Sequence, residues 1–434
     1  MRVVPPFRTA LLVLGLLTGG CLSSTASPSG TTHDTSARRA GCEAVRGQPL
    51  TREAPIEGVL LQEGGSDRPR VEAFLYPHPD YEGNPWSQWG QGLVLEDGRF
   101  LSAIGDHLGA DGNAYLYEYR PGSGLGLLGN VQAWLEGGAG DWGYGKVHGQ
   151  MVAGPCDDVY FSTYWGKQPD GGSGFLGDLL FRLDPQELVI ENLGVLVEEH
   201  GVPSLSGWPS GGLLFGEAVE PGTEPKEGPF FVYDVGSEEV VVRSGEEVPH
   251  EGFRNVAVDG KGRAYFSAGH GELWVYDPAS NGLQRHPELL PGDWLRASTT
   301  PGPDGTVYGA TRDPDMLFAL EPDGAVRSFG PARGYVASMA LHPDGTEFFY
   351  VPEAHGKSWR QGTPLVAVDT ASGEETVVVE LNPLAEGELG LRLGGTYNVA
   401  VDSAGETVFV GLNAGGPSDD APFGEVVLVV VRLP

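Results

Sequence analysis

The sequence has few cysteines and few basic residues, and it has no long apolar run beyond its first twenty residues. Of 434 residues, 3 are cysteine, and 27 Lys and Arg stand against 59 Asp and Glu, for a formal net charge of −32. This shortage argues against nucleic-acid binding, because phosphate contacts need clustered Lys and Arg. No apolar window approaches the ~20 residues of a membrane-spanning helix. Phosphate-loop, CxxC, HExxH and GxSxG motifs are also missing, so no short motif assigns a reaction.

The N-terminus predicts export. Arg2 and Arg8 precede the apolar run "TALLVLGLLTGG", which is typical of a secretory signal in residues 1–20. The stretch "LLTGGC" resembles a bacterial lipobox, in which the cysteine, here Cys21, is acylated. Two acyl chains would then anchor the protein stably in a bilayer. Ordinary secretion, with Cys21 incidental, is the alternative.

These features predict a monomeric lipoprotein of the bacterial cell envelope. Leu22 after the cysteine suits the outer membrane if the source is Gram-negative. Residues 21–41 are small and polar, and they are expected to form a flexible tether. Without residues 1–20 the chain keeps 27 − 2 = 25 basic residues against 59 acids, or −34. Such a charge favours solubility, and it leaves the lipid as the expected contact with a membrane.

Only Cys42 and Cys156 remain for a disulfide within the domain of residues 42–434. An oxidising envelope favours a bond between them. Two unpaired thiols are the alternative.

A repeat runs through the domain. A turn followed by a β-branched or aromatic strand recurs seven times, about 40 to 60 residues apart. The seven copies are "EDGRFLSAIGDH" (96–107), "CDDVYFSTYWG" (156–166), "SGGLLFGEAVE" (210–220), "DGKGRAYFSAGHG" (259–271), "PDGTVYGATRD" (303–313), "PDGTEFFYVPEAHG" (343–356) and "SAGETVFVGLNAG" (403–415). Most are followed by a second strand that ends on an acid, such as "LWVYDP" (273–278). Many short strands between Gly, Pro and Asp turns indicate an all-β protein.

The repeat resembles the seven-bladed β-propellers of the streptogramin lyase and regucalcin-like group over about residues 58–434. The resemblance implies seven four-stranded antiparallel blades around one channel, an arrangement that leaves only short exposed edges. The chain ends in the strand "EVVLVVVRLP" (425–434). We therefore expect 56–62 or 70–77 to add a strand to the last blade and close the ring.

In such a ring, the residues before each innermost strand and after the next strand meet at one end of the channel. We expect the ligand-binding residues in these windows, although a fold alone does not define a function. They are Trp89, His107, Tyr164, Trp165, Glu217, Arg254, Asn255, His270, Arg296, Arg312, His355, Tyr397 and Asn398. Lys146 and His148 in "GYGKVHGQ" (143–150) are the candidate catalytic pair, because a nearby cation favours a neutral histidine base. Alternatively, these side chains are polar only because the channel is wet.

A divalent metal is a possible cofactor. His107, His148, His270 and His355 belong to four different blades, and converging imidazoles can bind a transition metal. The resemblance also implies a metal in the central channel, but its acid and asparagine ligands are matched only loosely, by Glu217, Asn255 and Asn398. Arg254 and Arg296 could instead clamp a carboxylate.

Two functions follow. In the first, the propeller binds a small or oligomeric ligand, such as a carbohydrate or carboxylate-bearing molecule, or a protein partner. In the second, it is a metal-dependent lyase or hydrolase that acts at the same opening.

Overall fold

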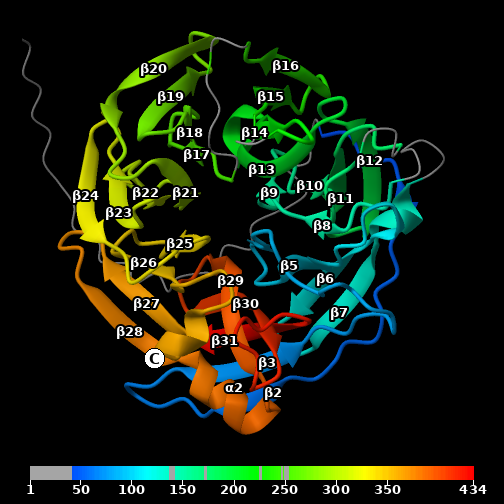
Figure 1. Cartoon of the computed structure of the whole chain (residues 1–434), viewed down its shortest axis with the longest axis vertical. Helices are drawn as coiled ribbons and strands as arrows, with labels where there is room; N and C mark the ends of the chain where they lie inside the picture. Colours follow the sequence, from blue (N-terminus) through cyan, green and yellow to red (C-terminus); the bar gives the residue numbers. More distant parts are fainter. Residues whose placement is uncertain (1–41, 136–141, 171–173, 224–226, 246–247, 249–253) are drawn as a thin grey trace, which may run out of the picture. The chain divides into compact units, whose positions relative to one another are not determined.

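The computed structural model describes residues 42–434, apart from 136–141, 171–173, 224–226, 246–247 and 249–253. The expected signal peptide (1–20), Cys21 and the tether (21–41) lie outside the described residues. Seven antiparallel sheets form a ring, and the chain passes through them in order (Figure 1). The prediction of an all-β, seven-bladed propeller is therefore confirmed.

Each blade runs from an inner strand to an outer strand. The inner strands are β4 (Leu93–Val94), β8 (Lys146–Val147) with β9 (Val152–Ala153), β13 (Gly201–Trp208), β17 (Ala257–Val258), β21 (Trp294–Ser298), β25 (Met339–Leu341) and β29 (Arg392–Val401). The second strands are β5 (Phe100–Gly105), β10 (Val159–Tyr164), β14 (Leu213–Val219), β18 (Ala264–Ser267), β22 (Val307–Arg312), β26 (Glu347–Tyr350) and β30 (Thr407–Gly415).

The third strands are β6 (Ala114–Arg120), β11 (Leu179–Asp184), β15 (Phe230–Asp234), β19 (Glu272–Asp277), β23 (Met316–Leu320), β27 (Pro364–Asp369) and β31 (Glu425–Arg432). The outer strands are β7 (Gly124–Asn130), β12 (Val189–Val195), β16 (Glu239–Arg243), β20 (Gly282–Leu289), β24 (Val326–Pro331), β28 (Glu375–Glu380) and β3 (Arg70–Leu75). Short helices lie between strands: η1 (Gly109–Asp111), η2 (Val131–Trp134), η3 (Pro209–Gly211), η4 (Ser358–Gln361) and α2 (Leu381–Leu389).

Both N-terminal candidates join the last blade. Strand β3 pairs with β31 from Arg70↔Arg432 to Leu75↔Val427, and β2 (Val59–Gln62) pairs with β3 in turn. The last sheet thus has five strands, two from the N-terminal part of the chain and three from the C-terminal end. The ring is closed by hydrogen bonds between residues more than 350 positions apart.

Strand β31 explains why the sequence "EVVLVVVR" is almost wholly apolar. Val427 and Val429 pack in one hydrophobic cluster with Phe349 of blade six, whereas Val430 packs in another with Phe100 of blade one. Successive side chains of a strand point to opposite faces, and in a propeller both faces are covered by neighbouring blades. The usual polar alternation is therefore absent.

An N-terminal strap (residues 46–58) runs along the outer strands before β2 begins. Strand β1 (Gln48–Pro49) pairs with β12 of blade two, and Ile56 N–H donates to Leu125 O of blade one at 2.9 Å. The strap covers backbone edges that would otherwise be open to pairing with another chain. Cys42 and Cys156 are both disulfide-bonded.

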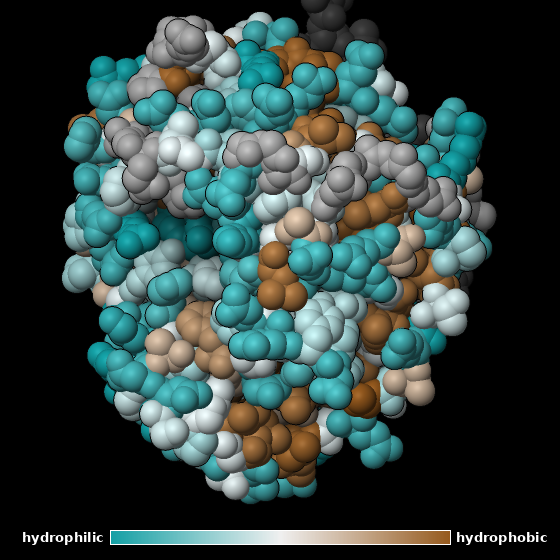
Figure 2. All heavy atoms as spheres, turned by 45° about the vertical axis from the view of Figure 1, so that its right-hand side comes forward, coloured by the Kyte–Doolittle hydropathy of each residue, from teal (hydrophilic) through white to brown (hydrophobic). Residues whose placement is uncertain are grey.

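Hydrophilic side chains dominate the face in Figure 2, with hydrophobic ones in separate patches. Within the described part of the chain, no helix is long and apolar enough to cross a bilayer.

Candidate functional site at the channel mouth

Trp89 lies at the centre of the site. It belongs to the loop before β4, and it is surrounded by side chains from several blades. Its ring centroid is 5.6 Å from that of His107, 6.4 Å from His148, 5.7 Å from His355 and 4.8 Å from Tyr397. These rings come from segments far apart in sequence, so the ring of blades brings the predicted windows together.

Positive charge gathers around the same ring. Lys146 Nζ lies 4.8 Å from the Trp89 ring centroid, and Arg254 Cζ lies 5.8 Å from it. Arg296 Cζ lies 5.5 Å from the Tyr397 ring. Cations over aromatic faces interact favourably with the ring quadrupole, so the aromatic residues help to hold these cations close together. We use the name channel mouth for the aromatic, histidine and cationic residues that gather here: Trp89, His107, Lys146, His148, Arg254, Arg296, Tyr335, His355 and Tyr397.

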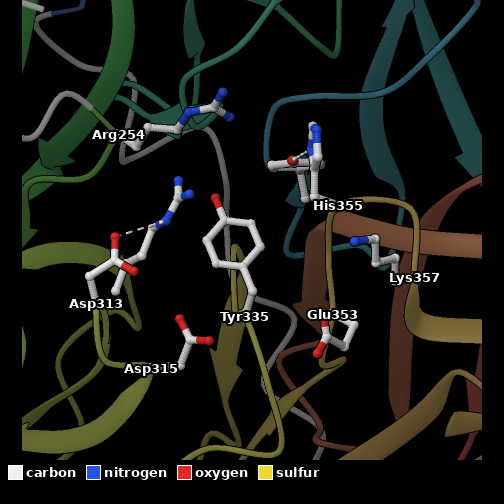
Figure 3. Close-up of a pocket in the computed structure, with 9 residues that line it drawn as sticks. Arg254, Asp313, Asp315, Tyr335, Glu353, His355 and Lys357 are labelled. Carbon is white, nitrogen blue, oxygen red and sulfur yellow. Dashed lines mark hydrogen bonds and ion pairs between the residues drawn. The ribbon is translucent and has the colours of Figure 1, made fainter. Parts of the chain in front are cut away.

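A pocket of about 380 Å³ opens beside Trp89, on the side of blades four to seven. Its lining is formed by Arg312 at the end of β22, Tyr397 in β29 and residues of the neighbouring loops: Arg254, Asp313, Asp315, Tyr335, Glu353, His355 and Lys357. Figure 3 shows Tyr335 in the middle of this lining, with its hydroxyl toward Arg254. The pocket therefore contains charges of both signs around an aromatic ring.

A smaller space of about 20 Å³ shares Arg254 and Tyr397 with the pocket and also touches Trp89, His148 and Arg296. Arg296 is 5% exposed, and its Nε donates a hydrogen bond to Tyr335 Oη. Its Nη2 is buried without a hydrogen-bond partner. No carboxylate of the described residues forms an ion pair with Arg296. Burial lowers the pKa of Arg296, but a guanidinium keeps its proton at any ordinary pH.

The two mouth tyrosines have opposite acidities. Burial acts to raise the pKa of Tyr335, but Arg296, Arg254 and Arg312 outweigh it and lower this pKa below the usual value of 10. Burial raises the pKa of Tyr397 to about 12, although Arg254 acts against it. The same cations thus stabilise the phenolate of Tyr335 more than that of Tyr397. Tyr335 is the more acidic group.

The three mouth histidines are neutral near pH 7. Burial, reinforced by Lys146, lowers the pKa of His107 to about 4. Burial and the charges of Arg254 and Lys146 put the pKa of His148 well below its usual range, and burial with Arg254 also lowers that of His355. His148 Nδ1 lies 2.7 Å from Pro203 O, which can only accept, so Nδ1 carries the proton and Nε2 is the basic nitrogen.

The mouth does not fit a divalent metal. The indole of Trp89 lies among the three imidazoles, and Lys146 and Arg254 would repel a cation at this position. Over the residues that the structure describes, no group of three or more His, Cys, Asp or Glu side chains could hold a metal ion. We therefore assign no metal-dependent step to this site.

Some of the predicted site residues lie elsewhere. Trp165 is buried in a hydrophobic cluster and contacts Phe175, and Glu217 is buried in β14, where burial raises its pKa well above the usual range. His270 follows β18 on an exposed turn, and none of its contacts with described residues joins it to the other mouth histidines.

The two predicted asparagines have structural partners. Asn398 Oδ1 accepts from Gly92 N–H at 2.9 Å, which ties the loop of blade one to blade seven. Asn255 Oδ1 accepts from Ser298 Oγ at 2.6 Å, although Asn255 also lines the smaller space. Tyr164 lies under the mouth, with Lys146 Nζ 5.9 Å from its ring.

Sequence reasoning missed five residues of the pocket lining: Asp313, Asp315, Tyr335, Glu353 and Lys357. Tyr335 does have a signal, because it lies a few residues before an inner strand, β25. The acids follow β22 and β26, and their position depends on how these loops bend back toward the channel.

No protein-family description and no curated protein sequence matches the chain. Among solved structures, a catalytically inactive virginiamycin B lyase from Staphylococcus aureus, solved with quinupristin, is similar with a TM-score of 0.50 and 10% identity. The match covers 84% of this chain and all of the lyase. The chain is thus a seven-bladed β-propeller similar in fold to the streptogramin lyases. The WD40 repeats of RRP9 are also similar, with a TM-score of 0.52, 10% identity, and coverage of 88% of this chain and all of that one. At such identities the likeness shows the fold alone.

Proposed function

We propose that this protein is a ligand-binding β-propeller whose channel mouth takes an anionic molecule, or the anionic end of an oligomeric one. The observation that carries the proposal is Arg296. A guanidinium that is 5% exposed and forms no ion pair with the described residues is costly, because burial removes its hydration without supplying a counter-charge. An anion bound at the mouth would supply that charge.

The neighbours of Arg296 suit an organic anion. Arg254 lies beside it, and guanidinium groups bind carboxylate, phosphate or sulfate through parallel hydrogen bonds. Trp89, Tyr335 and Tyr397 offer aromatic faces to the body of a ligand. The mouth histidines are neutral near pH 7, so the positive charge there comes from Lys and Arg.

A binding survey tests the proposal. The mature chain is titrated with sulfate, phosphate, citrate and a set of organic carboxylates, and Trp fluorescence and calorimetry report binding. We expect binding that quenches Trp89 and that Arg296→Gln weakens roughly 10- to 100-fold, the value of one charge-assisted hydrogen bond.

Arg285→Gln is the matched control. Arg285 is exposed on an outer strand and pairs with Glu272 at 2.7 Å, so its loss should leave affinity unchanged. Anions that bind equally well to the wild type and to Arg296→Gln would contradict the proposal.

An enzyme acting at the same mouth is a second candidate, and Tyr335 favours it. A tyrosine with a lowered pKa, held by an arginine beside a pocket, is suited to proton transfer. Ultraviolet titration at 295 nm tests this property: one tyrosine should ionise below pH 10 in the wild type and not in Tyr335→Phe. Identical titration curves would remove this candidate.

The lipid anchor remains part of the proposal. Its support is the apolar N-terminal run ending at Cys21. Cys21→Ser should release the protein from membranes after cell fractionation, and retention of the variant in the membrane fraction would contradict the anchor.

A further inference from the structure

The 380 Å³ pocket also contains two carboxylates that have no direct partner among the described residues. Asp315 and Glu353 are half-buried in its wall, and neither side chain forms a hydrogen bond or ion pair with the described residues. Of the acids in the lining, only Asp313 has an ion-pair partner within the described part of the chain, Arg312 at 3.5 Å. Lys357 lies in the same lining, and its ammonium forms no ion pair with described residues either. The lining therefore contains acids and a cation that do not pair directly with one another within the described residues.

The charges are separated in space. In Figure 3, Arg254 lies on the hydroxyl side of Tyr335, whereas Asp315 and Glu353 lie on the opposite side of the ring. Burial, together with the nearby charges of Asp313 and Glu353, raises the pKa of Asp315. The carboxylates therefore repel one another at one end of the pocket. At the other end, Arg254 repels Arg296, which lines the adjoining smaller space.

The backbone holds the acids in place at a cost. Asp313 has φ 54° and Glu353 has φ 56°, in the left-handed region that residues other than glycine rarely adopt. The Glu353 carboxylate also lies against Gly334, where a Cβ atom would come within 2.7 Å of Oε1. Strained positions of this kind persist where the surrounding structure needs them, often at binding sites.

We propose that the ligand is a zwitterion, with a carboxylate or similar anion bound by Arg296 and Arg254 and an ammonium group bound by Asp315 and Glu353. This inference rests on the proposed anion site and adds the chemical class of the ligand. An amino carboxylate, such as a free amino acid or a short peptide with its two charged ends, has this pattern. Its ammonium would relieve the repulsion between the acids, and its carboxylate would do the same for the arginines.

Calorimetry on the mature chain tests the inference. The probes are ω-amino acids from glycine to 6-aminohexanoate and the peptide triglycine, each compared with the alkanoate and the alkylamine of the same length. We expect at least one zwitterion to bind about tenfold more tightly than both matched compounds, because each end adds a charge-assisted hydrogen bond. Preference for triglycine over all free amino acids would identify peptide ends as the form that binds.

Variants separate the two ends. Asp315→Asn combined with Glu353→Gln should reduce the affinity for the zwitterion to that of the alkanoate, while leaving alkanoate binding unchanged or stronger. Arg296→Gln should weaken both. Asp323→Asn, on an exposed turn of blade five, is the matched control and should change neither.

The outcomes distinguish the two proposals. Alkanoates that bind as tightly as the amino acids, with dependence on Arg296, would overturn the zwitterion and keep the anion site. If none of these probes binds, the zwitterion is overturned, and the survey of anions alone decides the proposed function.

Protein stability gives a readout that needs no ligand. If Asp315 and Glu353 serve only the fold, the double variant should have a lower Tm. If they serve to bind an ammonium group, the double variant removes the repulsion between the two carboxylates and should raise Tm by about 1 to 2 °C.

Discussion

Two groups of arginines in this molecule differ in what they contact. Glu118 of blade one, whose side chain is fully buried, is surrounded by Arg99 and Arg120 of the same blade and by Arg52 of the strap. Arg99 Nη1 donates to Glu118 Oε1 at 2.8 Å, and Arg120 Nε donates to Oε2 at 2.9 Å. Arg99 also pairs with Asp97 at 2.7 Å. The buried charges of this cluster compensate each other within the protein.

The channel mouth has the opposite arrangement. Arg296 is as deeply buried as Arg99, at 5% against 6% exposed, but its only hydrogen bond to a described residue is to the hydroxyl of Tyr335. The comparison teaches that burial of an arginine does not reveal its role, whereas its counter-charge does. A compensated cluster stabilises a blade. An uncompensated one next to a pocket is suited to bind a ligand.

The largest expected effect comes from removing the centre of the blade-one cluster. Glu118→Gln keeps the shape of the side chain but leaves three arginines without their shared carboxylate. Breaking a buried ion pair in this way costs roughly 3–5 kcal/mol of the free energy of unfolding. Urea denaturation followed by circular dichroism measures it. Glu272→Gln, which breaks the half-exposed pair with Arg285, should cost less than about 1 kcal/mol. Equal losses would refute the distinction between the two kinds of pair.

The mouth should be the part of the molecule that acid destabilises. The pKa of His107 falls from 6.5 unfolded to about 4 folded, so the unfolded state binds more protons between these values. The contribution of His107 to the free energy of unfolding is therefore fully present above pH 6.5 and is lost as pH falls toward 4. The loss is about 2 kcal/mol at pH 5.

Thermal melts from pH 7.5 to 4.5 check this dependence. His107→Gln should lose less stability than the wild type over that range, whereas His200→Gln, outside the mouth, should follow the wild type. A wild-type Tm that stays constant down to pH 4.5 would show that the mouth accepts charged histidines.

The smallest effect is expected for Arg296→Met, and it sharpens the comparison most directly. Removing an uncompensated buried charge should change the free energy of unfolding by less than about 1 kcal/mol, or even increase it. Arg99→Met should instead cost several kcal/mol, because it leaves Glu118 and Asp97 with fewer partners. The denaturant midpoints of the two variants measure these two changes in stability. A large loss in Arg296→Met would mean that this arginine is structural.

Much of this architecture could be predicted from the repeat. Seven turn-and-strand units indicate seven blades, and the windows around the inner strands include His107, His148, Arg254 and Tyr397, which all contact Trp89. The same windows also include Trp165 and His270, which face other surroundings. The position of a residue relative to an inner strand predicts how far along the channel it lies. It does not predict the direction in which its side chain points.

The acids of the pocket could not be predicted in this way. Asp315 and Glu353 follow their strands by a few residues, and their place in the pocket depends on left-handed backbone turns at Asp313 and Glu353. The strap of residues 46–58 was also missed, because its backbone pairs with β12 and β7 without a hydrophobic pattern of its own.

The sequence by itself determined the number of blades, the order of their strands and the excess of negative charge, because these depend on local turns, side-chain alternation and composition. Only the tertiary structure decided which charges have partners. Ring closure brings together side chains hundreds of residues apart, and the counter-charge that each one finds there separates a structural arginine such as Arg99 from a candidate ligand-binding one such as Arg296.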